Sequence, residues 1–519
     1  MGVLSFLVLN DDRPAKRWPL RNAYLIGSNG NAIPGDLQFR GGVIECQKHD
    51  PGVAALALQI PAGDCGELTL QTCLLPDRKE PYLLHVELAR HQLMRLYHKQ
   101  EDWGMFDLDP EHKVMKRATL ARRLFIEALC QLKDDLVEAN RLAGDCLVAA
   151  IDGCEELALA HSELLLHRRK LNGNLPHYPI GCGINLDHKG DGLRAGLAAN
   201  FDFLYLPISW RHLAPEEGEY RWQKMDNWID WIARTRKPVV AGPIVSFEPH
   251  MVPDWLYIWE HDFDTIRDLI YEHVERVVDR YAGVITTWNV VSGLHVNDHF
   301  AFNLNQVMDL TRMTTMLVKK TQETARTIVE LRQPFGEYFS HNTRSVPPLM
   351  YADQLVQSAV NVDGFSIRML MGQAQSGQYT RDLMQISAML DMYATLAKPI
   401  SLILAVPSDQ VQRVEPVKGK SKSKKKRTDL NSGYWRKPWS TQVQSHWLEA
   451  IFQIGLSKPF VDSVVWSELV DHDEIELPQG GLIGTDLQPK PAFRRLATFR
   501  RSLLELAAPD DSTAVVGGM

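Results

Sequence analysis

The sequence contains no apolar run long enough to form a membrane-spanning helix, which needs about 18 residues. Residues 1–10 are apolar, but no basic residue precedes them, and Asp11 and Asp12 follow at once. This pattern is typical of a first β-strand rather than of a signal peptide. We therefore expect a cytoplasmic protein with no membrane partner.

Cysteine is scarce and shows none of the spacings that carry chemistry. The chain of 519 residues has 7 cysteines, the first at Cys46 and the last at Cys182, without a CxxC pair or a zinc-ligand pattern. Free thiols in a reducing compartment are the expected state. No GxGxxG or P-loop sequence opens a helix. We expect no metal and no cofactor.

The charge balance gives no general attraction to nucleic acid or anionic lipid, because the net charge is −7. One segment is an exception. Residues 418–427 (KGKSKSKKKR), from Lys418 to Arg427, are strongly basic. Like charges at this density stay solvated, so we expect a disordered insertion. Contact with a polyanion is the alternative interpretation.

The pattern of apolar residues changes twice along the chain. Residues 1–95 contain short apolar runs separated by turns, which predicts a β-rich, sandwich-like N-terminal domain. Residues 96–172 carry apolar residues at helical spacing, which predicts a helical connecting segment with a break at Gly144. We expect these helices to pack on a neighbouring domain. A separate coiled-coil partner is the alternative.

From residue 173 to residue 508, apolar strands alternate with helical segments. This alternation is the signature of a parallel sheet with crossover helices, and eight units favour a closed (β/α)8 barrel, or TIM barrel. Residues 509–519 are predicted to be a flexible tail. The expected strands lie at about 179–184, 202–207, 239–245, 285–291, 335–340, 363–369, 399–406 and 462–467.

Four short motifs in the predicted barrel carry a family resemblance. Residues 280–283 (RYAG) precede 288–293 (WNVVSG), and 480–483 (GGLI) precede 488–493 (QPKPAF). Together they resemble glycoside hydrolase family 10, the xylanase family, over about residues 175–505. The resemblance implies a (β/α)8 barrel and O-glycosyl hydrolase activity. It also suggests that the N-terminal domain is similar to a carbohydrate-binding module.

The same resemblance indicates that both catalytic carboxylates are missing. The family's proton donor corresponds to Gly293 and its nucleophile to Leu404, and neither strand end offers an acid in a neighbouring register. Retaining glycosidases need two carboxyl groups about 5–5.5 Å apart. Family positions that hold sugar also change, to Tyr205, Leu206, Ser209, Phe247 with Glu248, Arg368 and Leu370. We therefore predict a family member that is inactive by the family mechanism, a pseudoenzyme.

Polar residues remain after several predicted strands, where barrel enzymes build their sites. Glu248 and Glu468 are the candidates for relocated catalytic carboxylates. The candidate ligand-binding residues are Trp466, Arg368, His250, Trp210 and Asp471. A network of salt bridges that closes the barrel mouth is the alternative interpretation.

Three hypotheses about function follow from these patterns. The first is a non-hydrolytic protein that binds a glycan or a protein partner. The second is an active glycosidase on a β-linked glycan that uses relocated carboxylates. The third is a scaffold that works through the helical segment and the basic residues 418–427.

Overall fold

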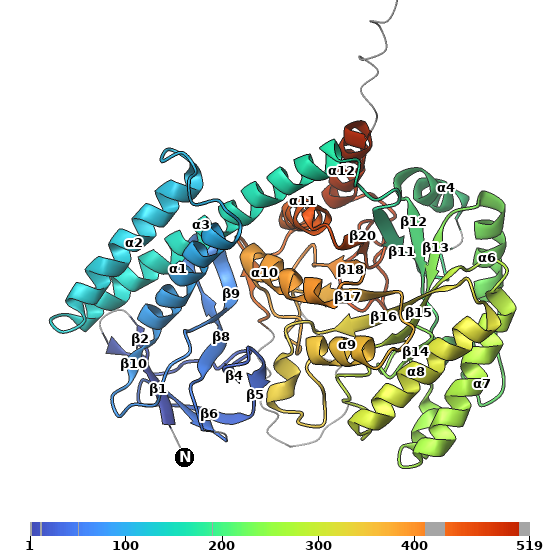
Figure 1. Cartoon of the computed structure of the whole chain (residues 1–519), viewed down its shortest axis with the longest axis horizontal. Coiled ribbons are helices and arrows are strands. Elements are labelled where there is room, and N and C mark those ends of the chain that lie inside the picture. Colours follow the sequence, from blue (N-terminus) through green and yellow to red (C-terminus); the bar gives the residue numbers. More distant parts are fainter. Residues whose placement is uncertain (1–2, 11–12, 50, 189, 411–430, 508–519) are drawn as a thin grey trace, which may run out of the picture.

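The core of the protein is a closed barrel of eight parallel strands (Figure 1). The computed structural model describes residues 3–10, 13–49, 51–188, 190–410 and 431–507. The strand positions are β11 (Ile180–Gly183), β12 (Phe203–Leu206), β13 (Val239–Ala241) continued by β14 (Val245–Ser246), β15 (Thr287–Ser292), β16 (Arg326–Arg332), β17 (Gly364–Leu370), β18 (Ile400–Ala405) and β20 (Val461–Trp466). Pairing of β13 with both β12 and β15 closes the ring. The predicted fold class is confirmed.

Helices follow the strands and surround the barrel, as a right-handed β/α repeat requires (Figure 1). They are α4 (Asp191–Asn200), α5 (Trp210–Leu213), α6 (Gln223–Thr235), α7 (Phe263–Tyr281), α8 (Leu304–Thr321), α9 (Pro348–Gln357), α10 (Leu383–Tyr393), α11 (Thr441–Ser457) and α12 (Pro491–Ala507). Three short 3-10 helices, η2 (Asp254–Trp259), η3 (Glu337–Ser340) and η4 (Ala394–Leu396), complete the loops.

The expected fifth strand at 335–340 is wrong. Residues 326–332 form β16, and the expected position holds η3 instead. The apolar run of β16 is interrupted by Glu330, a charged residue that is 1% exposed. A polar side chain inside a strand hides its hydrophobic pattern, and here it also marks the site described below.

The N-terminal sheets pack together over one hydrophobic core that includes Phe6, Ile44, Leu58 and Leu70. One sheet has the order β10-β1-β7-β6, and the other has the order β19-β9-β8-β4-β5. Their strands are β1 (Val3–Leu7), β4 (Tyr24–Ile26), β5 (Ala32–Ile33), β6 (Gly35–Arg40), β7 (Val43–Lys48), β8 (Ala55–Pro61), β9 (Gly66–Gln71) and β10 (Tyr82–Leu83), with β2 (Leu9–Asn10), β3 (Arg13–Pro14) and η1 (Gly63–Cys65) beside them. The cysteines are free.

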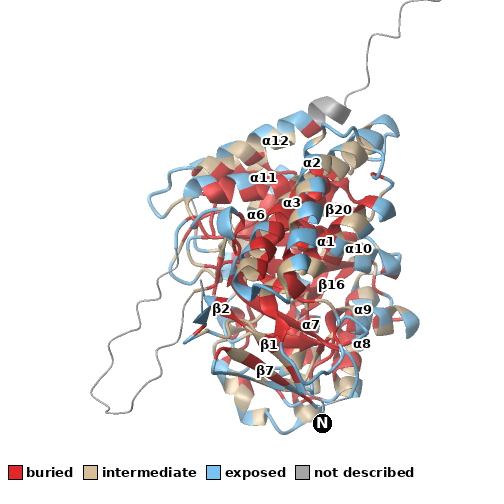
Figure 2. Cartoon of the chain, turned by 90° about the vertical axis from the view of Figure 1, so that its left-hand side faces the viewer, coloured by how far each residue is buried: buried red, intermediate tan, exposed pale blue. Residues whose placement is uncertain are grey.

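Three helices connect these sheets to the barrel: α1 (Leu84–Asp102), α2 (Lys113–Gln131) and α3 (Leu136–Leu171). The predicted boundary at residue 95 therefore falls within α1. Helix α3 passes through Gly144 without the expected break, because its Cys146 packs in the N-terminal core and its Leu157 in the barrel core. Figure 2 shows the buried residues of α3 and of the elements around it in red. None of the described helices is long and apolar enough to cross a membrane.

One strand of the N-terminal sheets comes from the far end of the chain. Strand β19 (Tyr434–Trp435) lies between β18 and α11 in sequence, yet it pairs with β9, with Trp435 opposite Gly66. The adjoining Arg436 forms ion pairs with Asp152 and Glu155 of α3. The strand pairing and these ion pairs therefore connect the N-terminal sheets and α3 to the segment that follows β18 of the barrel. The basic residues 418–427 and the tail 509–519 lie outside the described residues.

Candidate functional site

The end of β18, where the resemblance places the nucleophile, is apolar. Leu404 has no exposed surface and lies beside Trp466 and Met369 of the neighbouring strands. Leu370, at the end of β17, is 3% exposed and belongs to the same core. A carboxylate at this point would be desolvated without a partner. The end of β18 contributes to packing rather than to the site.

Gly293, directly after β15, occupies a position that rejects a larger side chain. Its φ is +68°, a left-handed conformation that favours glycine. A Cβ atom added here would lie 2.7 Å from Cδ of Arg332. The stem of Arg332 therefore fills the space beside the position that the resemblance assigns to the acid.

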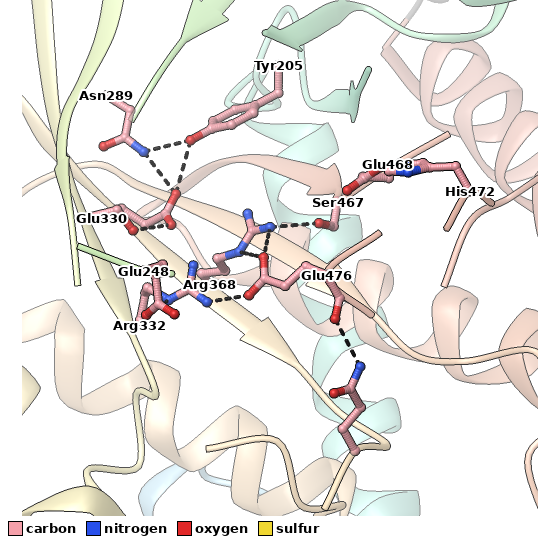
Figure 3. Close-up of polar contacts among 12 residues, drawn as sticks. Tyr205, Glu248, Asn289, Glu330, Arg332, Arg368, Ser467, Glu468, His472 and Glu476 are labelled. Atoms are coloured by element: carbon pink, nitrogen blue, oxygen red, sulfur yellow. Dashed lines mark hydrogen bonds and ion pairs between the residues drawn. The ribbon is translucent and has the colours of Figure 1, made fainter. Parts of the chain in front are cut away.

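A pocket with a volume of about 590 Å³ opens at the carboxyl ends of the barrel strands. This volume is typical of small-molecule sites. Six of the side chains that line the pocket are aliphatic, and we call this set the aliphatic wall: Ile184, Leu186, Pro207, Leu213, Met225 and Met251. The lining also includes polar and charged side chains from β12, β16, β17 and the loop after β20 (Figure 3). We call this cavity the mouth pocket.

Two arginines and two glutamates form an ion-pair network in the mouth. Glu476, from the loop after β20, binds Arg368 at 2.5 Å and also pairs with Arg332. All three side chains are only 11–12% exposed. Arg332 also binds Glu248, with 3.1 Å between Nε and Oε1. Burial opposes the charge on Glu476, but the two guanidinium groups prevail and hold its pKa well below the usual range. Glu476 is therefore a poor proton donor.

Glu330 of β16 forms a second cluster, in which neutral side chains donate the hydrogen bonds. Its carboxylate accepts hydrogen bonds from Ser292 Oγ at 2.7 Å, Asn289 Nδ2 at 2.9 Å and the Tyr205 hydroxyl at 3.1 Å. Asn289 also donates to the Tyr205 oxygen at 2.6 Å. Figure 3 shows Tyr205, Asn289 and Glu330 converging from β12, β15 and β16. Sequence reasoning missed Glu330. An acid inside the apolar segment TIVEL was the available signal.

The rim carries a third group. Glu468 and His472 form a hydrogen-bonded pair at 2.5 Å, and both line the pocket. Burial opposes the charged imidazolium, but the hydrogen bond to Glu468 and its charge raise the pKa of His472. The neighbouring His188 has a lowered pKa because of burial and of the nearby His472. Within the described parts of the chain, no group of His, Cys, Asp or Glu is arranged to hold a metal ion.

The predicted site residues divide into two groups. His250, Arg368 and Glu468 line the mouth pocket. Glu248 lies beside it, bound to Arg332. The carboxylates predicted as relocated catalytic groups, Glu248 and Glu468, are thus engaged in different ion pairs.

Three predicted ligand-binding residues do not line the mouth pocket and lie in the core instead, so their assignment is wrong. Trp466 has no exposed surface, and its Nε1 donates to Gly480 O at 2.8 Å. Trp210 is 3% exposed and stacks on His273 at 4.3 Å. Asp471 is 5% exposed and pairs with Lys490 at 2.5 Å. The sequence could not reveal these contacts, because each partner lies 14 or more residues away along the chain.

The model of glycosyl hydrolase family 10 matches residues 207–496, more than half of the chain. The chain belongs to glycosyl hydrolase family 10. Solved family 10 structures match it at low identity. A family 10 structure from Paenibacillus barcinonensis is 16% identical, covering 64% of this chain and 97% of its own, with a TM-score of 0.46.

Two further family 10 structures give similar values. Xylanase 10B from Thermotoga petrophila, solved with xylobiose, is 16% identical over 65% of this chain and 98% of its own, with a TM-score of 0.45. The intracellular xylanase TsXylA from Thermoanaerobacterium saccharolyticum, solved as a mutant with xylotetraose, is 14% identical over 62% and 95%, with a TM-score of 0.46. In this family 10 chain, the polar groups of the mouth come from β12, β15, β16, β17 and the loop after β20.

Proposed function

We propose that this family 10 protein binds a short carbohydrate in the mouth pocket and lacks the two-carboxylate mechanism of its family. One observation carries the proposal: the pocket stays open while the two assigned carboxylate positions hold Gly293 and Leu404. Leu404 is fully buried, and the space beside Gly293 is filled by Arg332. The family's nucleophile and acid therefore have no counterpart at these positions.

The pocket is suited to a sugar because its lining combines apolar and polar side chains. The aliphatic wall offers apolar surface to the C–H face of a ring. The polar lining residues offer carboxylate, guanidinium and hydroxyl groups that can exchange hydrogen bonds with sugar hydroxyls. No tryptophan lines the described pocket, so stacking of a sugar on an indole is not part of this binding mode.

A glycan array followed by calorimetry with xylotriose tests this proposal. Leu186 is partly exposed on the aliphatic wall, and Leu186→Trp fills the pocket. We expect at least about tenfold weaker binding, which corresponds to about 1.4 kcal/mol. The matched control is Leu171→Trp, at a leucine that is 70% exposed on α3 outside the pocket. Equal binding by both variants, or no binding by the wild-type protein, contradicts the proposal.

Hydrolysis assays run beside the binding screen test the other hypotheses. Loss of xylan hydrolysis in both Glu248→Gln and Glu468→Gln would favour a relocated carboxylate pair. The scaffold hypothesis depends partly on residues 418–427, outside the described structure. If deletion of residues 418–427 leaves carbohydrate binding unchanged, these basic residues do not contribute to binding in the mouth pocket. The scaffold hypothesis can then be tested separately from the carbohydrate-binding hypothesis. A carbohydrate-binding role for the N-terminal sheets belongs to the same proposal and is tested by the array.

A further inference from the structure

The mouth pocket contains a hydroxyl and a carboxylate in the arrangement of a nucleophile and its base. The Tyr205 hydroxyl donates to Glu330 Oε2 at 3.1 Å, and both residues line the pocket. A weak nucleophile becomes effective when an adjacent base removes its proton as it attacks. In such sites a third group orients the base. Here Ser292 and Asn289 hold the two oxygens of Glu330 at 2.7 and 2.9 Å.

We propose that Tyr205 and Glu330 are a nucleophile–base pair that cleaves glycosides through a tyrosyl–glycosyl intermediate. This inference rests on the proposed carbohydrate binding in the mouth pocket, and it names the chemistry that this site performs. Sialidases use a tyrosine nucleophile in place of a carboxylate, so the chemistry has a precedent on other glycosidases. The substrate is a glycoside that binds in the mouth pocket with its anomeric carbon next to the Tyr205 oxygen.

The surroundings of Tyr205 define how the proton moves. Burial and the charge of Glu330 raise the pKa of Tyr205, while Arg368 acts in the opposite direction. The phenol is therefore protonated at rest, and its proton must pass to Glu330 during the attack. Figure 3 shows the Arg368 guanidinium between this pair and Glu476. The positive charge of Arg368 is positioned to stabilise the phenolate character that develops.

The reaction balances in two steps. In the first, Tyr205 Oη bonds to the anomeric carbon, the bond to the leaving-group oxygen breaks, and the phenol proton moves to Glu330. The leaving oxygen takes a proton from the Glu468–His472 pair, which lines the same pocket. In the second, water attacks the anomeric carbon and gives its proton to that pair. Tyr205 Oη departs and recovers its proton from Glu330, so the net reaction is hydrolysis.

Trapping of the intermediate tests the pair directly. The probe is 2,4-dinitrophenyl 2-deoxy-2-fluoro-β-D-xyloside, whose fluorine slows both steps and whose leaving group needs no proton. Intact-protein mass spectrometry and peptide mapping are expected to find the fluoroxylosyl group on Tyr205. Tyr205→Phe and Glu330→Gln are expected to prevent labelling. With 4-nitrophenyl β-D-xyloside, each variant is expected to lower kcat by about 10²- to 10⁴-fold.

Tyr393→Phe is the matched control. Tyr393 is a buried tyrosine of α10, away from the pocket, and its hydroxyl donates to Pro334 O at 3.2 Å. This variant loses one buried hydroxyl and is expected to label and turn over like the wild-type protein. Thermal unfolding of all variants confirms that they are folded.

The outcomes separate this inference from the proposed function. Label on a carboxylate, or full turnover by Tyr205→Phe, overturns the pair and leaves carbohydrate binding in place. Xylotriose binding by calorimetry without any labelling or turnover does the same. Absence of both binding and turnover contradicts the proposed function, on which the pair depends.

Discussion

The ends of β18 and β16 face the same barrel mouth but have opposite chemistry. β18 ends in Leu402, Ile403, Leu404 and Ala405, all buried and apolar. β16 ends in Glu330 and Arg332, two positions apart on one face of the strand and each engaged in a polar network. Arg332 is in register with Arg368, and Arg368 with Ile403, so Ile403 is the β18 residue on the face that carries Glu330 and Arg332, and Leu404 lies on the opposite face.

The barrel backbone fixes the direction in which each side chain points. The sequence decides which strand carries the charged residues. A barrel mouth is built from the ends of several strands, so a polar site can form at a different strand while the backbone is kept. The two strand ends are therefore expected to respond differently when a charge is added to one or removed from the network around the other.

Leu404→Glu is expected to destabilise the protein the most, by about 4 kcal/mol or more, because it buries a carboxylate without a partner. Urea unfolding measures the loss, and Leu404→Met, which conserves volume, is expected to cost under about 1.5 kcal/mol. Equal stability of the Glu and Met variants would show that the end of β18 accepts charge after all.

Glu476→Gln is expected to cost about 3 kcal/mol, because it leaves Arg332 and Arg368 without a shared counter-charge. The depressed pKa of Glu476 means that its contribution is complete above its unfolded pKa, about 4.5, and is lost as the pH falls toward the folded value. The melting temperatures of the two proteins are therefore expected to converge below about pH 4.5. Glu474→Gln, at an exposed side chain in the same loop, is the control. A constant difference at every pH would contradict this account.

Gly293→Ala is expected to cost about 1–3 kcal/mol, because the residue has a positive φ and its Cβ would meet Arg332. Gly283→Ala serves as the control, since a Cβ there meets no atom within 4 Å. Thermal unfolding compares the two. If both alanines are tolerated equally, the space beside Gly293 is not blocked, and a proton donor could be restored there.

Glu468→Gln is expected to have the smallest effect on stability, under about 1 kcal/mol, because the pair with His472 is partly exposed at the rim. The raised pKa of His472 makes this contribution complete below its unfolded value, about 6.5, and lost as the pH rises through the folded value. NMR titration of His472 is expected to show a lower pKa in the variant. An unchanged pKa would mean that Glu468 does not hold the imidazolium.

The sequence predicted the barrel because its signals are local. Apolar strands, amphipathic helices and the segments 288–293 and 488–493 depend on neighbours in the chain. β16 escaped for the same reason, since Glu330 breaks the apolar run and its partners Tyr205, Asn289 and Ser292 lie 38 to 125 residues away. In the sequence alone, a buried acid whose hydrogen-bond donors are distant along the chain resembles the polar residue that ends a strand.

The candidate site was predicted in part. Arg368 lies near the end of β17, while His250 and Glu468 come shortly after β14 and β20, and strand ends define the mouth of any such barrel. Trp466 and Trp210 were misjudged because a sequence does not show whether an indole faces solvent or the core. Glu476 was not identified either. It lies in a long loop, and only the folded loop brings it to the two arginines.

The pairing of β19 with β9 can form only late in synthesis of the chain. β9 ends at Gln71, whereas its outer partner begins at Tyr434. At about 5–20 residues per second, a ribosome needs roughly 20–70 s to make the chain between them. During that interval β9 is an open sheet edge, the kind of surface that recruits strands from other chains. We therefore expect β9 to be open to pairing with strands of neighbouring nascent chains on the same messenger RNA until β19 has been synthesised and can pair with it.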